Sequence, residues 1–275
     1  MWHCGKFQFE LSRPLVMGIV NVTPDSFSDG GRHLSAANAI AHARQLIADG
    51  ADILDIGGES TRPGAALVSE QEELDRVLQV VEGLRDIPVP ISIDTYKPEV
   101  MRAALAAGAS MVNDINALQA PGALDVVADC NAGVCLMHKQ GMPQTMQQHP
   151  QYQDAVSEVS AFLRERIAVA ETAGIARDRI VIDPGFGFGK TLAHNLDLLS
   201  DLDTFSALGV PVLAGLSRKS MLGAITGREV NDRMAASLAA AMLAVERGAA
   251  IVRVHDVRET VDALKIWNAV KGSER

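Results

Sequence analysis

Short apolar runs recur along the chain, and polar side chains that could bind a ligand or take part in a reaction follow each of them. These residues are Asn21, the turn 57–62, Asp94, Asn113 with Asp114, His138, Asp183, the turn 217–219, and Arg253 with His255. A lone Asn or Asp after a strand often does no more than stabilise a turn. The whole set is more polar than closing one end of the fold would require, so it predicts a ligand site.

Two kinds of ligand chemistry are represented in this set. A flat ligand that donates several hydrogen bonds in one plane, such as an amino-substituted heterocycle, suits Asp94, Asn113 and Asp183. A polyanion suits the group made of Asn21, Arg62, Arg253 and His255. The chain has 25 Lys and Arg against 34 Asp and Glu, a net charge of −9. Gathering cations at one place in an acidic protein indicates an anionic ligand rather than a packing role.

Alternating strands and helices must position these residues. The apolar runs that predict strands are Leu15–Val20, Ala51–Ile56, Val89–Ile93, Ala109–Val112, Gly133–Met137, Arg179–Ile182, Val210–Leu216 and Ala249–Val252. The segments between and after them that predict helices are Ala36–Ala48, Glu70–Leu84, Glu99–Ala107, Gly122–Ala128, Asp154–Ala173, Asn195–Ala207, Asn231–Arg247 and Val257–Val270. Strands that are apolar throughout are typical of parallel sheets covered on both faces.

A repeating strand–helix unit of about 34 residues matches the size of a closed (β/α)8 TIM barrel, which belongs to the α/β class. A doubly wound parallel sheet is the alternative. Phe7, Phe9 and Leu11 alternate with polar residues near the start of the chain, which predicts a β-hairpin that plugs the amino end of the barrel. We expect one domain over residues 1–275, with the reacting groups at the carboxyl ends of the strands.

Composition excludes several classes of protein. The acidic balance leaves no overall basic surface for nucleic acid or an anionic membrane, and no apolar stretch is long enough to span a bilayer. Cys4, Cys130 and Cys135 include no C-x-x-C pair, so neither a disulfide framework nor a structural zinc site is indicated. We expect a cytoplasmic enzyme that has no nucleic-acid or membrane partner.

The glycine-rich segment 183–191 does not fit two familiar phosphate-binding motifs. In a Walker A loop the first glycine would fall on Pro184, and the segment lacks the spacing of a dinucleotide-binding turn. We interpret its glycines as allowing the backbone and Phe188 to approach a flat ligand closely.

The predicted helix over Met234–Val245 is apolar around its whole circumference apart from Ser237. The outer helix of a barrel should have a polar face unless another surface covers it. This helix therefore predicts a subunit interface and a homodimer.

Five motifs resemble those of the bacterial dihydropteroate synthases, and the similarity extends from Val16 to Val257. They are the segments 17–31 (MGIVNVTPDSFSDGG), 51–64 (ADILDIGGESTRPG), 182–190 (IDPGFGFGK), 215–220 (GLSRKS) and 253–255 (RVH). Each of the first two is highly specific by itself. The resemblance implies a pterin-binding barrel that joins p-aminobenzoate to 6-hydroxymethyl-7,8-dihydropterin diphosphate, releasing pyrophosphate and 7,8-dihydropteroate.

The resemblance also implies roles for individual residues. The pterin would be bound by Asp94, Asn113, Ile115, Met137, Asp183, Phe188, Gly215 and Lys219. The diphosphate would be held by Asn21, Arg62, Arg253 and His255, with Mg²⁺ bound through Asn21 and Asp29. The p-aminobenzoate, and the sulfonamide inhibitors that imitate it, would be surrounded by Phe27, Thr61, Arg62, Pro63, Phe188 and Ser220.

Under this interpretation the catalytic residues are Asp94, Lys219, Arg253 and His255. The arylamine is neutral at pH 7, so leaving-group stabilisation dominates and the step is SN1-like. The loops 22–33 and 59–68 should be mobile and close over the diphosphate to complete the p-aminobenzoate pocket. Two alternatives remain: a methyltransferase that moves a methyl group from a reduced folate to a corrinoid, and a non-catalytic pterin-binding homologue.

Overall fold

Eight parallel strands close into a barrel in the computed structural model, which describes residues 1–22, 32–60, 67–142 and 145–273. The strands are β3 (Leu15–Asn21), β4 (Ile53–Gly57), β5 (Ile91–Asp94), β6 (Met111–Asp114), β7 (Gly133–Met137), β8 (Ile180–Asp183), β9 (Val212–Ala214) and β10 (Ala249–Val254). Consecutive strands are neighbours, and β10 pairs with β3 to close the circle. The predicted TIM barrel is confirmed.

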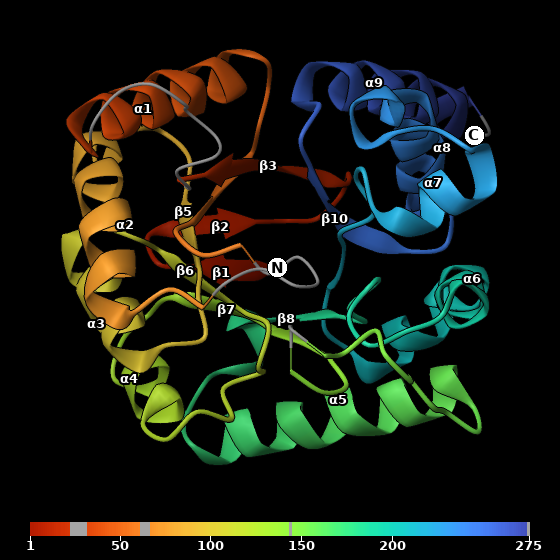
Figure 1. Ribbon diagram of the computed structural model, residues 1–275, viewed down its shortest axis with the longest axis horizontal. Coiled ribbons are helices and arrows are strands. Elements are labelled where there is room, and N and C mark those ends of the chain that lie inside the picture. The colour runs from red at the N-terminus through yellow and green to blue at the C-terminus, as the bar shows by residue number, and fades with distance from the viewer. Residues whose placement is uncertain (23–31, 61–66, 143–144, 274–275) are drawn as a thin grey trace.

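Helices surround the strands (Figure 1). They are α1 (Arg32–Ala48), α2 (Glu70–Leu84), α3 (Pro98–Ala107), α4 (Ala123–Ala128), α5 (Ala155–Thr172), α6 (Leu192–Ser200), α7 (Ser220–Thr226), α8 (Met234–Glu246) and α9 (Val257–Ser273). Ser69 and Asp154 cap the amino ends of α2 and α5 through their side chains, as such residues commonly do. None of the helices in the described part of the chain is both long and apolar enough to cross a membrane.

Several details of the predicted elements were wrong. The helix expected over Asn195–Ala207 is two elements, α6 and a 3₁₀ helix over Leu202–Leu208. A single helix was expected because the apolar pattern continues across the break between them. Helix α7 was not predicted, and only seven residues form it. Several strands also end one or two residues later than expected, since the hydrogen-bonded ladder includes the polar residues at their carboxyl ends.

The predicted hairpin is present as β1 (Trp2–Cys4) and β2 (Phe7–Phe9), which pair in antiparallel fashion. Trp2 and Cys4 are fully buried. They join an apolar cluster with the strand residues that fill the amino half of the barrel interior. The hairpin therefore fills the amino end of the barrel, as predicted, although β1 supplies the buried side chains. The single-domain organisation stays a prediction.

Alternation along the strands places a polar layer above this apolar cluster. Met17, Ile53, Met111, Val181, Leu213 and Ile251 belong to the cluster. Residues two positions further along a strand lie on the same face of the sheet. Those residues are Ile19, Asp55, Asn113, Asp183, Gly215 and Arg253, so the carboxyl half of the interior is mostly polar.

Candidate active site

A buried network centred on Arg253 occupies the carboxyl half of the barrel. The guanidinium Nε donates to Asp55 Oδ2 at 2.5 Å, and one Nη donates to Asp94 Oδ2 at 2.7 Å. Asn113 Nδ2 donates to the same Asp55 oxygen at 3.0 Å. These contacts bring together residues of β4, β5, β6 and β10, so the network exists only in the closed barrel.

Burial of ionised groups in this network costs free energy. Burial raises the pKa of Asp94 to about 7, although Arg253 lowers it, and neighbouring Asp55 adds to the increase. The two carboxylates raise the pKa of Arg253 despite its burial, so the guanidinium stays charged. Asp55 Oδ1 is buried and has no hydrogen-bond partner in the described structure. A polar ligand that entered this layer would find acceptors already in place.

Asp183, at the end of β8, lies in the same polar layer. Its Oδ1 accepts the Gly185 N–H at 2.7 Å, and burial raises its pKa while Lys219 opposes the shift. A Cβ atom at Gly215 would lie 3.9 Å from Asp183 Oδ2 and 3.8 Å from Arg253 Cβ. Glycine at this position therefore leaves room beside both charged groups.

Lys219 and Phe188 are brought together beside Asp183. The ammonium of Lys219 lies 4.7 Å from the centre of the Phe188 ring and donates to the Phe186 carbonyl oxygen. Burial lowers the pKa of Lys219 to about 8, against the attraction of Asp183. An aromatic ring, a cation and a carboxylate thus meet at one place, which is suitable for a flat, hydrogen-bonding ligand.

His255 follows β10 and is oriented by Ser217. The Ser217 Oγ atom lies 2.9 Å from His255 Nδ1 and also accepts the His255 backbone N–H at 3.2 Å. Asn21 ends β3 opposite Gly57, which in turn pairs with Asp94. Both residues therefore lie at the carboxyl end of the barrel, as the prediction of an anion site requires.

The remaining predicted residues divide into two groups. Ile115 and Met137 are buried near the carboxyl ends of β6 and β7, and Ser220 is exposed at the first position of α7. Five predicted residues lie outside the described ranges: Phe27, Asp29, Thr61, Arg62 and Pro63. Most of the loops 22–33 and 59–68 lies outside those ranges too.

Some of the polar residues that follow strands have structural roles. Asp114 accepts the backbone N–H groups of Asn116 and Leu118, both at 2.7 Å, and so stabilises the turn after β6. Arg218 pairs with Asp256, where the shorter distance is 2.5 Å. Glu59 pairs with Lys97 at 2.7 Å beside α3. Each of these residues stabilises the local structure, which is the common role of a polar residue after a strand.

Asp55 and Lys190 were not recognised as site residues from the sequence. Asp55 interrupts an otherwise apolar strand, and a charge at such a position is a signal that could have identified it. Lys190 ends the family motif 182–190 and belongs to the segment that fails the phosphate-binding spacing, but neither pattern gives it a role of its own. It is in fact buried, with its Nζ 3.0 Å from His138 Nδ1.

In the described part of the chain, residues that could bind a metal ion occur singly and not in groups. No group of three or more His, Cys, Asp or Glu residues in those ranges is arranged to hold a metal ion. Asn21 offers one amide oxygen at the mouth of the barrel, and its predicted partner Asp29 is not described.

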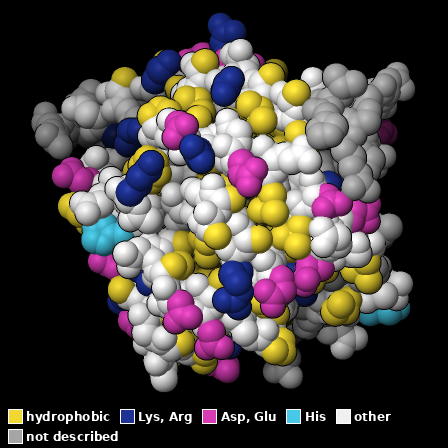
Figure 2. Space-filling model, turned by 90° about the vertical axis from the view of Figure 1, so that its left-hand side faces the viewer, with side chains coloured by type: hydrophobic (Ala, Val, Ile, Leu, Met, Phe, Trp, Pro, Cys, Tyr) yellow, Lys and Arg dark blue, Asp and Glu magenta, His cyan; other side chains and the backbone are white. Residues whose placement is uncertain are grey.

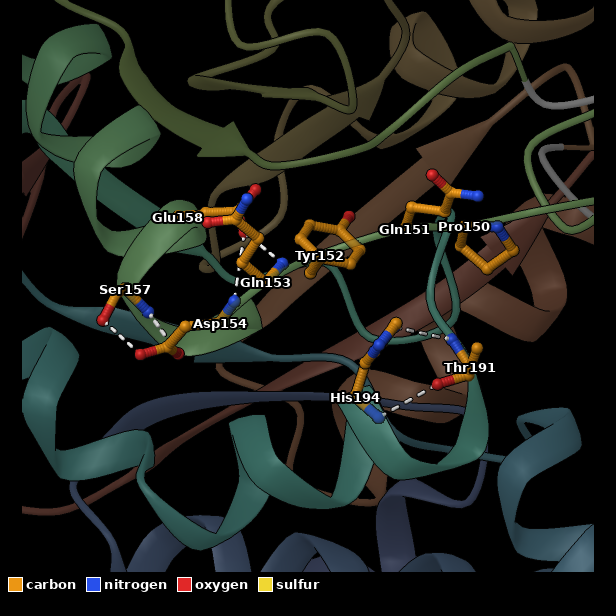
Figure 3. Close-up of a pocket in the computed structure, with 9 residues that line it drawn as sticks. All are labelled: Pro150, Gln151, Tyr152, Gln153, Asp154, Ser157, Glu158, Thr191 and His194. Atoms are coloured by element: carbon orange, nitrogen blue, oxygen red, sulfur yellow. Dashed lines mark hydrogen bonds between the residues drawn. The ribbon is translucent and has the colours of Figure 1, made fainter.

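A separate open pocket of about 850 Å³ lies between the amino ends of α5 and α6 (Figure 3). Its polar groups are occupied by contacts within the protein. Asp154 accepts from Ser157, Glu158 accepts the N–H groups of Gln153 and Asp154, and His194 forms a capping box with Thr191. These contacts stabilise the helix ends, so the pocket is a weaker candidate than the barrel mouth.

Comparison with known proteins gives consistent matches. The model of the pterin binding enzyme family matches residues 17–255. A dihydropteroate synthase of Escherichia coli strain K12 is 52% identical over 261 residues, covering 94% of this chain and 93% of that protein.

Solved structures agree with this match. A Xanthomonas albilineans dihydropteroate synthase with 4-aminobenzoic acid has a TM-score of 0.90 and 58% identity, covering 95% of this chain and 94% of that chain. A Yersinia pestis dihydropteroate synthase in a sulfonamide drug complex has a TM-score of 0.93 and 49% identity, covering 98% of each chain.

Proposed function

Because this chain belongs to the pterin-binding enzyme family and has the activity of a dihydropteroate synthase, we propose how its own residues carry out that reaction. The enzyme joins p-aminobenzoate to 6-hydroxymethyl-7,8-dihydropterin diphosphate and releases pyrophosphate and 7,8-dihydropteroate. The observation that carries the proposal is the polar layer around Arg253, which buries two carboxylates beside a site framed by Asp183 and Lys219.

The pterin binds in this polar layer. Asp183 accepts hydrogen bonds from the amino and ring N–H groups of the pterin, and Asn113 and Lys219 complete the hydrogen bonding in the ring plane. The apolar faces of the ring lie against Ile115, Met137, Phe188 and Gly215. Support comes from the cation–ring contact between Lys219 and Phe188 and from the space beside Gly215.

The diphosphate binds at the carboxyl end of the barrel, where Asn21, Arg253 and His255 lie and to which Arg62 belongs by the family motif. The Ser217 hydroxyl fixes the orientation of the His255 ring for this contact. A hard oxygen ligand such as the Asn21 amide fits Mg²⁺, which commonly binds through one or two protein oxygens and substrate phosphates. Asn21 and Asp29 would hold the ion, which when bound offsets charge on the departing pyrophosphate.

Departure of pyrophosphate is the difficult step, and the residues act mainly on charge. Arg253 and His255 stabilise the negative charge that grows on the leaving group. The ionised form of Asp94, which pairs with Arg253 at 2.7 Å, stabilises positive charge at the methylene carbon, so the step has SN1-like character. The arylamine attacks in its neutral form and loses its proton afterwards.

The p-aminobenzoate site lies outside the pterin pocket. Ser220 is exposed directly after Lys219, and the Phe188 ring lies 4.7 Å from the Lys219 ammonium. Phe27, Thr61, Arg62 and Pro63 complete the site in the family pattern. We expect sulfonamides to compete with p-aminobenzoate and not with the pterin diphosphate; steady-state inhibition patterns distinguish the two.

The subunit contact is on the side of α7 and α8. Exposed large apolar residues on this side include Ile225, Val230, Met234 and Leu243. None of the exposed large apolar residues of the described chain lies within α1–α4 on the opposite side, although Leu67 just before α2 is exposed, and charges of both signs are spread over that side among smaller hydrophobic patches (Figure 2). We propose a two-fold homodimer through Met234–Val245. Light scattering that showed only the 29.3 kDa species at micromolar concentration would contradict it.

The reaction takes place in the cytoplasm. Cys4, Cys130 and Cys135 are free thiols, as expected in a reducing compartment. Burial raises the pKa of the Cys4 thiol to about 12, so it is inert and fills space in the hairpin.

A pyrophosphate-release assay tests the proposed reaction. We expect release only when the pterin diphosphate and p-aminobenzoate are both present. A methyltransferase would release no pyrophosphate from this mixture, and a non-catalytic homologue would bind the pterin without turnover. Either result would contradict the proposal.

A further inference from the structure

Side chains, rather than regular secondary structure, hold the backbone beside the proposed pterin pocket. We call residues 185–189, which follow β8, the glycine loop. The carbonyl oxygens of this loop accept hydrogen bonds from four side chains: Lys190 to Gly185 (2.9 Å) and Phe188 (3.1 Å), Lys219 to Phe186, Gln147 to Gly187, and Tyr152 to Gly189 (3.0 Å). Every carbonyl group of the loop has a side-chain donor, so these donors determine its shape.

The loop is also pressed against the backbone that follows β7. Gly185, Gly187 and Gly189 all have positive φ values, of 73°, 77° and 65°. A Cβ atom on Gly185 would lie 1.8 Å from the His138 carbonyl oxygen. The backbone approach is therefore too close for any side chain at that position.

Lys190 is the donor that connects two separate positions of the loop, Gly185 and Phe188. Its Nζ contacts the Gly185 and Phe188 carbonyl oxygens and lies 3.0 Å from His138 Nδ1 and 3.4 Å from the His138 carbonyl oxygen. Only 3% of the Lys190 surface is exposed. Its hydrogen bonds within the described structure go to neutral groups, which is an unusual environment for a buried lysine.

The charges facing Lys190 explain why it can stay there. Burial lowers the pKa of Lys190 to about 7, Asp183 of β8 opposes the shift, and Lys219 reinforces it. Burial also lowers the pKa of His138 to about 3, so the imidazole is neutral. A neutral ring can accept one N–H from the ammonium when its own proton is on Nε2.

We propose that Lys190 is a positioning residue for the pterin site, an inference that rests on the proposed pterin pocket. By holding the Gly185 and Phe188 carbonyl groups together, it places two groups that face the ligand. One is the Gly185 N–H, which orients Asp183 Oδ1 at 2.7 Å. The other is the Phe188 ring beneath the Lys219 ammonium. Lys190 does not itself touch the reacting atoms.

The test measures how tightly 6-hydroxymethyl-7,8-dihydropterin diphosphate binds to Lys190→Met, which keeps the length of the side chain and removes its donors. We expect the dissociation constant to rise at least tenfold, about 1.4 kcal/mol, with a matching rise in the pterin KM. The value of kcat at saturating pterin should change much less, because the reacting groups are intact. Lys190→Arg, which keeps cationic donors, should recover most of the affinity.

Arg179 provides a matched control at the other end of β8. It is also a buried cation bound to backbone carbonyl groups, those of Ala132 at 2.8 Å and Val127 at 2.7 Å. Arg179→Met should lower the melting temperature as Lys190→Met does, yet leave the pterin dissociation constant unchanged. If Lys190→Met does not fold, Lys190→Gln replaces it, because its shorter amide cannot bring the nitrogen to both carbonyl groups.

Three results are decisive. Failure of the unaltered protein to bind the pterin diphosphate would overturn the proposed pocket itself. If the unaltered protein binds and the Lys190 variant binds equally well, only the positioning role is wrong. An equal loss of affinity in Arg179→Met would show that general destabilisation, and not the glycine loop, is responsible.

Discussion

The amino end of the barrel interior is packed with apolar side chains, whereas the carboxyl end, two residues further along the same strands, holds buried charges. Ile53 lies in the lower cluster, and Asp55 of the same strand binds Arg253 above it. Burial of the lower, apolar layer stabilises the folded state, whereas removing the ions of the upper layer from water destabilises it. Stability alone would not select the upper layer, so its residues reflect the requirements of the ligand.

The largest expected effect concerns the amino end. Trp2→Ala removes a fully buried side chain from the hairpin and should lower the free energy of unfolding by about 3–5 kcal/mol. Pterin affinity should be unchanged in the protein that remains folded. Urea unfolding together with calorimetric titration of the pterin diphosphate measures both, and a weaker pterin affinity would mean that the two ends are coupled.

The next effect concerns the carboxyl end. Asp183→Ala leaves the donors of the pterin unpaired and should weaken pterin binding by roughly 2–4 kcal/mol. Its unfolding free energy should fall by less than that of Trp2→Ala. Titration calorimetry tests the affinity, and binding as tight as that of the parent would contradict the assignment of the pocket.

The smallest effect has the opposite sign. The pKa of Asp94 is raised to about 7, so the stability that its protonated form provides is present below the unfolded pKa of about 3.9 and is lost as the pH rises through 7. Asp94→Asn mimics the protonated form. It should therefore gain on the order of 1 kcal/mol over the parent near pH 8, with no gain near pH 4, while pyrophosphate release falls.

Unfolding measurements across this pH range decide the matter. A destabilised Asp94→Asn at every pH would show that the ion pair with Arg253 outweighs the cost of burying the carboxylate. The contrast between the two ends would then be smaller than we infer.

The sequence was sufficient to predict the barrel because its strands are apolar on both faces. The polar residues at strand ends, such as Asp94 and Asp183, were also predicted, since the carboxyl ends of barrel strands converge. The role of Asp55 was not predicted: its charge within an apolar strand marks the position, but its partner Arg253 is 198 residues away in the sequence. Helix α7 was missed because its seven residues, with a glycine among them, are too few to show a helical pattern.

Lys190 illustrates a different limit. Its position beside glycines suggested a phosphate-binding motif that the spacing excluded, and no further role followed from the sequence. The contacts that define its role come from His138, 52 residues earlier, and from carbonyl groups whose directions depend on glycine φ angles. Such backbone arrangements are not visible in a list of residue types.

Closure of the barrel by β10 against β3 has a consequence for the order of events during synthesis. Asp55 and Asp94 leave the ribosome long before Arg253, so the cation that compensates them arrives only with the last strand. Until then the growing sheet has two unpaired edges, at β3 and at its newest strand, which can pair with other chains. A chain that stalls before residue 249 should therefore accumulate as an aggregation-prone open sheet, and a chaperone that shields β3 would protect it.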